Sequence, residues 1–211
     1  TQATNALLEG DVARVGIIVT GGGGVSSLLA KAQTKLGRLP LVTGRYIETF
    51  SGYIDKERLS EETARAAVRA LKAKGAEIIV ASEVYGVDDG EGEAVIARAA
   101  EKEKMKVTRA SEISKLYGLT TRTRTAAVNA SILPKMLDTA DSTERSVKAT
   151  GIQAPLMIMR GDGGVMSIEE MRKRPILSMM SGPTASVVGA LMYLRASVGI
   201  YFEVGGTSTN I

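Results

Sequence analysis

Apolar and polar positions along the chain follow periods that predict alternating strands and helices. An apolar run at residues 14–20 stops at four consecutive glycines, residues 21–24, which predicts a strand followed by a turn. A short helix is expected over residues 25–36, and extended or hairpin structure over residues 41–54. The chain therefore begins as a mixture of strands and helices.

Ser60 has the sequence context of a helix N-cap, because two glutamates follow it in what would be the first turn. The apolar face of this helix comprises Ala64, Ala67, Val68 and Leu71, and Gly75 is expected to end it. A buried strand is predicted at residues 77–84, a helix at 91–104 and a short strand at 106–109. This order is typical of a parallel or mixed sheet covered by helices.

The second half of the chain is predicted to begin with one long helix at residues 120–149, kinked near Pro134. The elements expected after it are a core strand at 155–159, a helix at 167–174, a strand at 176–180, a helix at 183–195 and a strand at 199–204. A boundary near residue 120 would divide the chain into an N-terminal α/β region, residues 1–119, and a second region, residues 120–211.

The composition limits the kinds of catalytic and metal-binding site that the chain can form. The chain has no cysteine and no histidine, which excludes disulfides, His-dependent catalytic triads and thiolate or imidazole zinc sites. A metal would have to be a hard ion with oxygen ligands, with Mg²⁺ the leading choice. The net charge is +4, aromatics are 4% and charges of both signs are interspersed, so a nucleic-acid partner is disfavoured. No apolar run approaches the roughly 18 residues that span a bilayer.

The last predicted strand leads into the strongest local motif. An acidic residue is followed by paired glycines and three hydroxyl residues. Glycines let backbone N–H groups approach phosphate oxygens, hydroxyls add donors, and the carboxylate is a candidate Mg²⁺ ligand. An ordinary β-hairpin turn is the alternative interpretation. The residues concerned are Glu203, Gly205, Gly206, Thr207, Ser208 and Thr209.

Two further segments have a functional and a plain interpretation. Asp162, followed by Gly163 and Gly164, comes after an apolar strand, where α/β proteins bind ligands, but a tight turn explains it as well. Ser181 or Thr184 would cap the next helix and place free N–H groups near an anion, but an ordinary helix start has the same pattern.

Other segments favour structural roles. The glycines at 21–24 are a candidate phosphate cradle, but a lone glycine run is not specific, and a flexible surface loop is the favoured interpretation. Arg122 and Arg124 are candidates for binding phosphate or RNA. A solvated helix start is favoured, since residues two apart do not share a helix face and cannot form a clamp there. Six methionines between residues 157 and 180 are interpreted as core filling.

Five ordered segments resemble the hydantoinase/oxoprolinase family, which also includes ketone carboxylase subunits. They are TNALLEG at residues 4–10, RTRTAAVNASILP at 122–134, PLMIMRGDGG at 155–164, SGPTASVVGA at 181–190 and EVGGTSTNI at 203–211. The matching family stretches include ATNALLEG, PLLIMQSDGG, SGPAAGVVGA and DMGGTSTDV. The resemblance extends over nearly the whole chain.

The resemblance implies an α/β fold of the actin-like (ribonuclease H-like) type, with mixed sheets flanked by helices and ATP between two lobes. It also implies an ATP-dependent hydrolase that opens a small cyclic amide, of the hydantoin or 5-oxoproline type, by phosphorylating the amide oxygen. Phosphate contacts would fall to residues 205–209, Mg²⁺ to Glu203, catalysis to Asp162 and Glu203, and the substrate cleft to Gly163, Gly164 and Ser181. A cytoplasmic, oligomeric enzyme with a second hydantoinase-type subunit is expected.

Three features depart from the family pattern: Glu203 and Asn210 each stand where the family has Asp, and the glycines at 21–24 replace a less glycine-rich loop. The changes at Glu203 and Asn210 favour the alternative of a non-catalytic nucleotide-binding or regulatory module, and a ketone carboxylase subunit is also open. The family's first phosphate loop would precede Thr1 and its adenosine segment would follow Ile211. We therefore expect an incomplete fragment of the two-lobed fold that does not turn over ATP alone.

Overall fold

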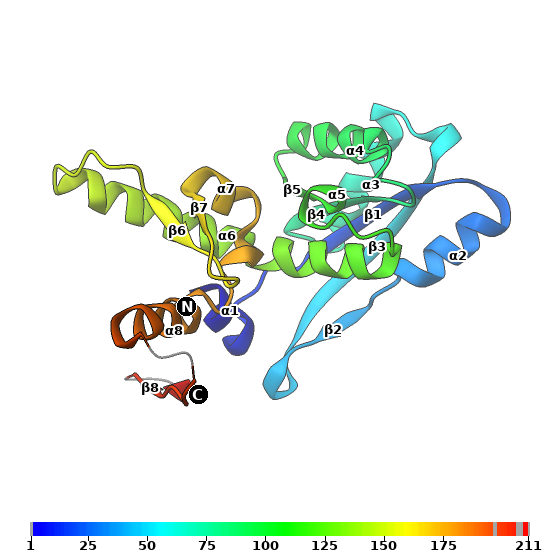
Figure 1. Cartoon of the computed structure of the whole chain (residues 1–211). Coiled ribbons are helices and arrows are strands. Elements are labelled where there is room, and N and C mark those ends of the chain that lie inside the picture. Colours follow the sequence, from blue (N-terminus) through cyan, green and yellow to red (C-terminus); the bar gives the residue numbers. More distant parts are fainter. Residues whose placement is uncertain (1, 196–197, 206–208, 211) are drawn as a thin grey trace. The chain divides into compact units, whose positions relative to one another are not determined.

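The computed structural model describes residues 2–195, 198–205 and 209–210 (Figure 1). The chain packs as two compact units. Unit 1 comprises residues 1–5 and 136–211, and unit 2 comprises residues 6–135. The division falls inside one long helix, between Lys135 and Met136, some way beyond the boundary expected near residue 120.

Unit 2 is built on a five-stranded mixed sheet with the order β2-β3-β1-β4-β5. Strands β3, β1, β4 and β5 are parallel, and β2 joins the edge antiparallel to β3. Every residue of β1 and of β4 is buried, as expected for central strands covered on both faces. The bounds are Val15–Gly21 for β1, Arg38–Pro40 for β2, Tyr46–Asp55 for β3, Ile78–Glu83 for β4 and Lys106–Arg109 for β5.

Helices cover both faces of this sheet (Figure 1). On one face, α3 (Glu61–Ala73) and α4 (Glu91–Lys102) enclose an apolar core that includes Ile18, Val68 and Ile96. On the other face, Ser82 of β4 meets Thr123 of α6 at 2.8 Å between their hydroxyl oxygens. The predicted parallel or mixed α/β sheet is therefore confirmed.

The helix that begins after Ser60 has the predicted cap. The Thr63 amide donates to Ser60 Oγ at 3.2 Å, and the Ser60 amide donates to Thr63 Oγ1 at 2.9 Å. This reciprocal capping box satisfies two amides at the helix start. After the helix ends at Ala73, Gly75 adopts a φ of 100°, a left-handed conformation that glycine takes without steric cost.

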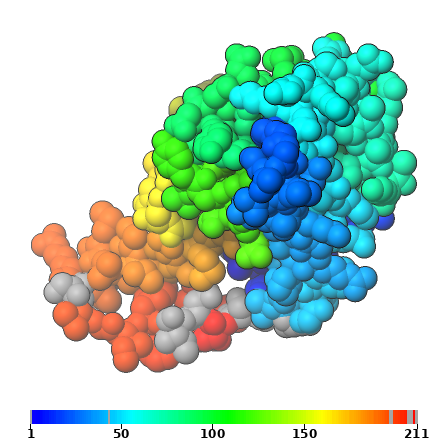
Figure 2. All heavy atoms as spheres, turned by 90° about the vertical axis from the view of Figure 1, so that its right-hand side faces the viewer, coloured from blue at the N-terminus to red at the C-terminus, as the bar shows by residue number. Residues whose placement is uncertain are grey.

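The shorter elements of unit 2 connect this framework. They are α2 (Gly24–Thr34), η1 (Val42–Gly44), η2 (Lys56–Arg58) and α5 (Ala110–Ile113), and α1 (Gln2–Glu9) precedes β1. The surface loop expected at residues 21–24 is shorter than predicted: Gly21 ends β1, Gly24 begins α2, and only the exposed Gly22 and Gly23 connect them. Helix α2 lies on the surface of unit 2, in blue in Figure 2, and exposes Val25, Leu28 and Leu29.

The long helix α6 (Leu119–Ala149) was predicted closely and continues through Pro134. Arg122 in its first turn differs from the expectation of a solvated side chain, because it is fully buried. Its guanidinium donates to the carbonyl oxygens of Leu116 at 2.7 Å and of Val84 at 3.2 Å, and also to that of Glu83. Sequence spacing could not show this, since the acceptors lie on other segments.

Besides the second half of α6, the described part of unit 1 contains two hairpins, two α-helices and a 3-10 turn. Their bounds are β6 (Met157–Met159), β7 (Val165–Ser167), α7 (Ile168–Lys173), η3 (Pro175–Ser178), α8 (Ser181–Leu194), β8 (Glu203–Val204) and β9 (Thr209–Asn210). Strand β6 pairs antiparallel with β7, and β8 pairs antiparallel with β9. The helix expected at 167–174 is α7, and Ser167 caps it, since the Glu170 amide donates to Ser167 Oγ at 3.2 Å.

Three strand predictions in this unit were wrong in position or type. The expected core strand at 155–159 is the short β6, which lies in a two-stranded hairpin and leaves Met157 half exposed. The expected strand at 176–180 is the 3-10 turn η3, where Pro175 fixes the first φ and Ser178 Oγ donates to the Pro175 carbonyl at 2.7 Å. The expected strand at 199–204 is reduced to Glu203–Val204.

The methionine prediction holds only in part. Met166 and Met171 are buried, whereas Met157 and Met180 are half exposed.

Among the described residues, no helix combines the length and apolarity needed to cross a bilayer.

Candidate functional site

The Asp162 turn connects β6 to β7 and closes their hairpin. The Arg160 amide donates to the Gly164 carbonyl at 2.8 Å, and the Gly164 amide donates to Asp162 Oδ1 at 3.1 Å. Gly163 has a φ of 89°, which favours glycine at the tip of the turn. The plain interpretation of this segment as a tight turn is therefore correct in geometry.

Asp162 is ionised and already has partners. Its second carboxylate oxygen pairs with the Arg160 guanidinium, although the carboxyl group remains largely exposed. The hydrogen bond from the Gly164 amide, followed by Arg160, holds the pKa of Asp162 below its ordinary value. Such a carboxylate is a weak base and a poor proton donor, so it suits orientation and electrostatics better than proton transfer.

The start of α8 lies against this turn. Thr184 Oγ1 donates to the Gly161 carbonyl at 2.9 Å, and the Gly161 amide donates to the Leu177 carbonyl at 2.8 Å. A Cβ on residue 161 would collide with the Met179 carbonyl oxygen, so only glycine fits there. The structure therefore brings together residues 160–164, η3 and the first turn of α8.

Helix α8 begins without a side-chain cap. Ser181 is its first residue, and neither Ser181 nor Thr184 accepts from a first-turn amide. The residue before it, Met180, adopts left-handed backbone angles with φ 58° and ψ 12°. The expectation of a Ser181 or Thr184 cap was wrong, because Thr184 is engaged with Gly161 instead.

The C-terminal motif forms a hairpin. Glu203 pairs with Asn210 and Val204 pairs with Thr209, so four residues connect two antiparallel strands. Glu203 is half-buried, and Gly205 and Thr209 are exposed. The predicted phosphate-binding residues Gly206, Thr207 and Ser208 lie outside the described residues.

The predicted Mg²⁺ site depends on the acidic side chains in the described part of the chain. No group of three acidic side chains there converges in a way that could hold an ion. Glu203, the residue to which the sequence assigns Mg²⁺, lies half-buried at the start of β8, and its assignment as a ligand stays a prediction. Magnesium usually binds through one or two carboxylates together with substrate phosphates, so one protein carboxylate is compatible with a nucleotide-bound ion.

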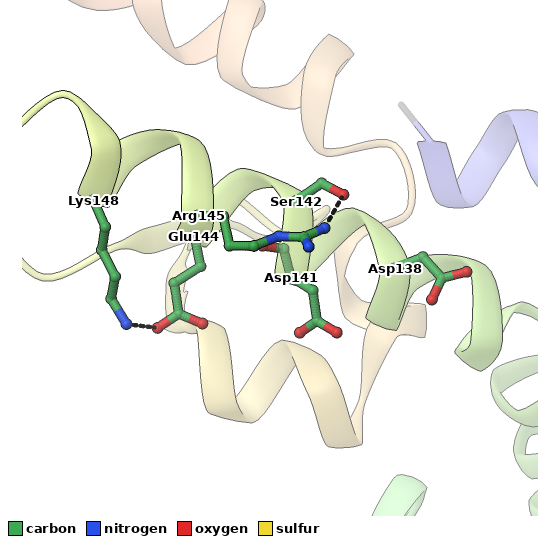
Figure 3. A pocket seen from close by; sticks show the side chains of 6 residues that line it. All are labelled: Asp138, Asp141, Ser142, Glu144, Arg145 and Lys148. Atoms are coloured by element: carbon green, nitrogen blue, oxygen red, sulfur yellow. Dashed lines mark hydrogen bonds and ion pairs between the residues drawn. The ribbon is translucent and has the colours of Figure 1, made fainter.

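A separate hollow of about 440 Å³ runs along α6 and is lined by charged side chains (Figure 3). Glu144 pairs with Lys148 at 3.0 Å and with Arg172 of α7 at 2.9 Å, and Arg172 also pairs with Asp141. Lys148, followed by Arg172, lowers the pKa of Glu144. These ion pairs join α7 to α6 within unit 1, which is a structural role.

Unit 2 contains a second polar cluster at the carboxyl ends of β1 and β4. Glu83 Oε2 accepts from the Gly92 amide at 2.9 Å, and Lys56 Nζ lies 2.8 Å from Glu83 Oε1. Glu93 accepts from the Ser111 hydroxyl at 2.6 Å, and burial raises the pKa of Glu93. These buried acids hold loops in place and are fully engaged by chain donors.

Sequence reasoning did not identify Arg160 or Thr4 as parts of the site. Arg160 stands where the quoted family stretch has Gln, two residues before Asp162, so its spacing could have indicated the ion pair. Thr4 accepts from the Met180 amide at 3.1 Å across a separation of 176 residues. No local pattern could reveal a contact of that kind.

The fold and the site together define a class of protein: an α/β fold in which a glycine-rich turn, residues 161–164, follows a strand and lies against the first turn of a helix, α8. Comparison with known families makes this specific. The model of the hydantoinase/oxoprolinase N-terminal region matches residues 1–104, and the hydantoinase/oxoprolinase model matches residues 122–211. The chain belongs to the hydantoinase/oxoprolinase family.

Solved structures support the fold. The ATP-dependent caprolactamase of Pseudomonas jessenii matches with a TM-score of 0.67 and 22% identity, over 99% of this chain and 33% of its own. A nucleotide-free acetone carboxylase matches with a TM-score of 0.64 and 21% identity, over 92% of this chain and 31% of its own.

A relative found by sequence similarity is also much longer than this chain. An uncharacterised protein of Methanocaldococcus jannaschii is 24% identical over 157 residues, which is 71% of this chain and 23% of that protein. The chain therefore spans between about a quarter and a third of the proteins it matches.

Proposed function

We propose that this chain provides a nucleotide phosphate-binding part of an ATP-dependent enzyme that opens a small cyclic amide. The observation that carries the proposal is the β8–β9 hairpin, in which Glu203 pairs with Asn210 and Val204 with Thr209 on either side of the sequence Gly-Gly-Thr-Ser. Paired glycines and hydroxyls on such a turn are suited to phosphate oxygens. The likeness to an ATP-dependent caprolactamase supports both the nucleotide and a lactam substrate.

The chain's own residues have distinct roles in this proposal. The amides of Gly205 and Gly206, with the hydroxyls of Thr207, Ser208 and Thr209, bind the phosphate tail, and Glu203 holds Mg²⁺. When bound, MgATP supplies the phosphoryl group that turns the amide oxygen into a leaving group. Asp162, kept ionised by Gly164 and Arg160, orients groups in the cleft beside Gly163, Gly164 and Ser181.

A second candidate is a ketone carboxylase subunit, which the likeness to acetone carboxylase favours. A third is a nucleotide-binding module without catalysis, favoured by the engagement of Asp162 with Arg160. Phosphate release from the full gene product that carries this chain distinguishes these functions. Stimulation by hydantoin, 5-oxoproline or caprolactam supports the first, stimulation only by acetone with bicarbonate supports the second, and no stimulation with intact binding supports the third.

All three candidate functions require that the β8–β9 hairpin binds nucleotide, and a binding measurement tests this requirement. Titration calorimetry with MgATP should show that Glu203→Gln and Thr209→Val each weaken binding by about tenfold, because each removes a charge or donor at the hairpin. Thr143→Val is the matched control, since Thr143 Oγ1 bonds only within α6, to the Thr139 carbonyl at 2.8 Å. Equal affinity in all four proteins would refute the assignment of phosphate binding to this hairpin.

The isolated 211-residue chain is expected to bind MgATP without substrate-stimulated turnover, because it spans only about a third of its solved relatives. The measurement is phosphate release by the purified chain, with and without a cyclic amide. Robust stimulated hydrolysis would contradict this expectation.

A further inference from the structure

Met180 occupies a strained position at the entrance to α8. Its φ of 58° lies in the left-handed region, where a side chain with a Cβ is disfavoured. It lies between the 3-10 turn η3 and the first residue of α8. Strain of this kind persists only where the surrounding structure holds it, and it occurs often at functional sites.

Hydrogen bonds on both sides hold Met180 in this conformation. Its amide donates to Thr4 Oγ1 at 3.1 Å, and its carbonyl accepts from the Thr184 amide at 3.1 Å. The Thr4 hydroxyl therefore satisfies an amide that the left-handed turn would otherwise leave to solvent. Both Thr4 and Met180 belong to unit 1.

The same junction is in direct contact with the Asp162 turn. Gly161 donates to Leu177 on one side of Met180 and accepts from Thr184 on the other. The Met179 carbonyl also leaves no room for a side chain at position 161. A shift of Met180 would therefore move both the start of α8 and the turn that carries Asp162.

We propose that Thr4 is a positioning residue for this site. By accepting the Met180 amide, its hydroxyl maintains the left-handed junction and so sets the direction of the first α8 turn relative to residues 160–164. The consequence for ligand binding rests on the proposed function above, whereas the positioning itself is a property of the folded chain.

Three variants of the 211-residue chain test this role by NMR hydrogen exchange and by MgATP titration. Thr4→Val removes the hydroxyl at nearly constant shape, Thr4→Ser restores it, and Thr143→Val removes a helical threonine hydroxyl elsewhere in unit 1. We expect the Met180 amide to exchange about fivefold faster in Thr4→Val, as the loss of one hydrogen bond implies. The amide shifts of Gly161 and Gly163 should move, and MgATP affinity should fall by about threefold.

Exchange close to wild type in Thr4→Ser and in Thr143→Val completes the expected result. Unchanged exchange in Thr4→Val, or equal acceleration in Thr143→Val, would overturn the positioning role. If wild type itself does not bind MgATP while exchange follows the prediction, the proposed function fails and the role of Thr4 stands. If Thr4→Val does not fold, Thr4→Ala replaces it in the same comparison.

Discussion

Single residues at the Asp162 turn show how local geometry limits chemistry. Asp162 looks like a catalytic acid in the sequence, yet the structure engages both of its oxygens, with Arg160 and with the Gly164 amide. Its pKa is lowered, which keeps it charged at neutral pH. Its assignment as a catalytic residue stays a prediction, and orientation is the role that this geometry favours.

Gly161 offers the sharpest test of how tightly this turn packs against η3. Gly161→Ala should destabilise the protein by about 1–3 kcal/mol, because its Cβ would overlap the Met179 carbonyl oxygen. The control is Gly189→Ala in α8, where a Cβ meets nothing within 4 Å. That change should stabilise the helix by roughly 0.5–1 kcal/mol. Urea unfolding measures both, and equal effects would contradict the packing described here.

Arg122 tests the buried polar cluster of unit 2. Arg122→Met should cost about 3 kcal/mol, because the carbonyls of Glu83, Val84, Leu116 and Tyr117 lose a buried donor. Arg124→Met, two residues along the same helix at an exposed position, should be nearly neutral. A small effect at Arg122 in urea unfolding would show that solvent can replace its contacts.

At the scale of elements, prediction succeeded where local signals act alone. The Ser60 cap of α3 and the glycine after that helix follow from short-range chemistry. The prediction failed at residues 176–180, where an apolar run fits either a strand or a buried turn. Pro175 and contacts to distant residues decide in favour of η3. An apolar run does not show which segment it packs against, and that packing determines whether its backbone is extended or helical.

In the candidate site, too, local features could be predicted from the sequence and tertiary contacts could not. The Asp162 turn and the β8–β9 hairpin could be placed from glycines and an acidic residue, because those residue types determine turns. The Thr4 contact could not, since it depends on tertiary packing, and the spacing of Arg160 from Asp162 permits their ion pair without determining the rotamer that forms it. The buried state of Arg122 depended in the same way on acceptors far along the chain.

At the scale of the whole molecule, the chain is two compact units that share helix α6. The division at residues 135 and 136 was not predicted, because the helix is continuous there and only packing distinguishes its two halves. Pro134 was the available local signal. Fold class, by contrast, followed from the order of elements, which the family comparison and the sheet both bear out.

The pH dependence of stability tests the ion pairs that connect α3 to the end of α4 in unit 2. Arg69 and Arg65 hold the pKa of Glu103 at about 2, below its ordinary value. A lowered carboxylate pKa stabilises the folded state above the unfolded pKa, and that contribution is lost as the pH falls towards the folded value. The Tm of wild type should therefore exceed that of Glu103→Gln near neutral pH, and the gap should close between about pH 4.5 and 2. A gap that stays constant over this range would contradict the ion-pair assignment.

The central claim is that the β8–β9 hairpin binds the phosphate tail of a nucleotide. The most direct measurement is an NMR titration of the labelled chain with MgATP, with inorganic phosphate as the reference ligand. The account predicts saturable shifts concentrated at Glu203, Val204, Gly205 and Thr209, larger with MgATP than with phosphate. Shifts centred instead on the glycines at 21–24, or no saturable shift at all, would contradict it.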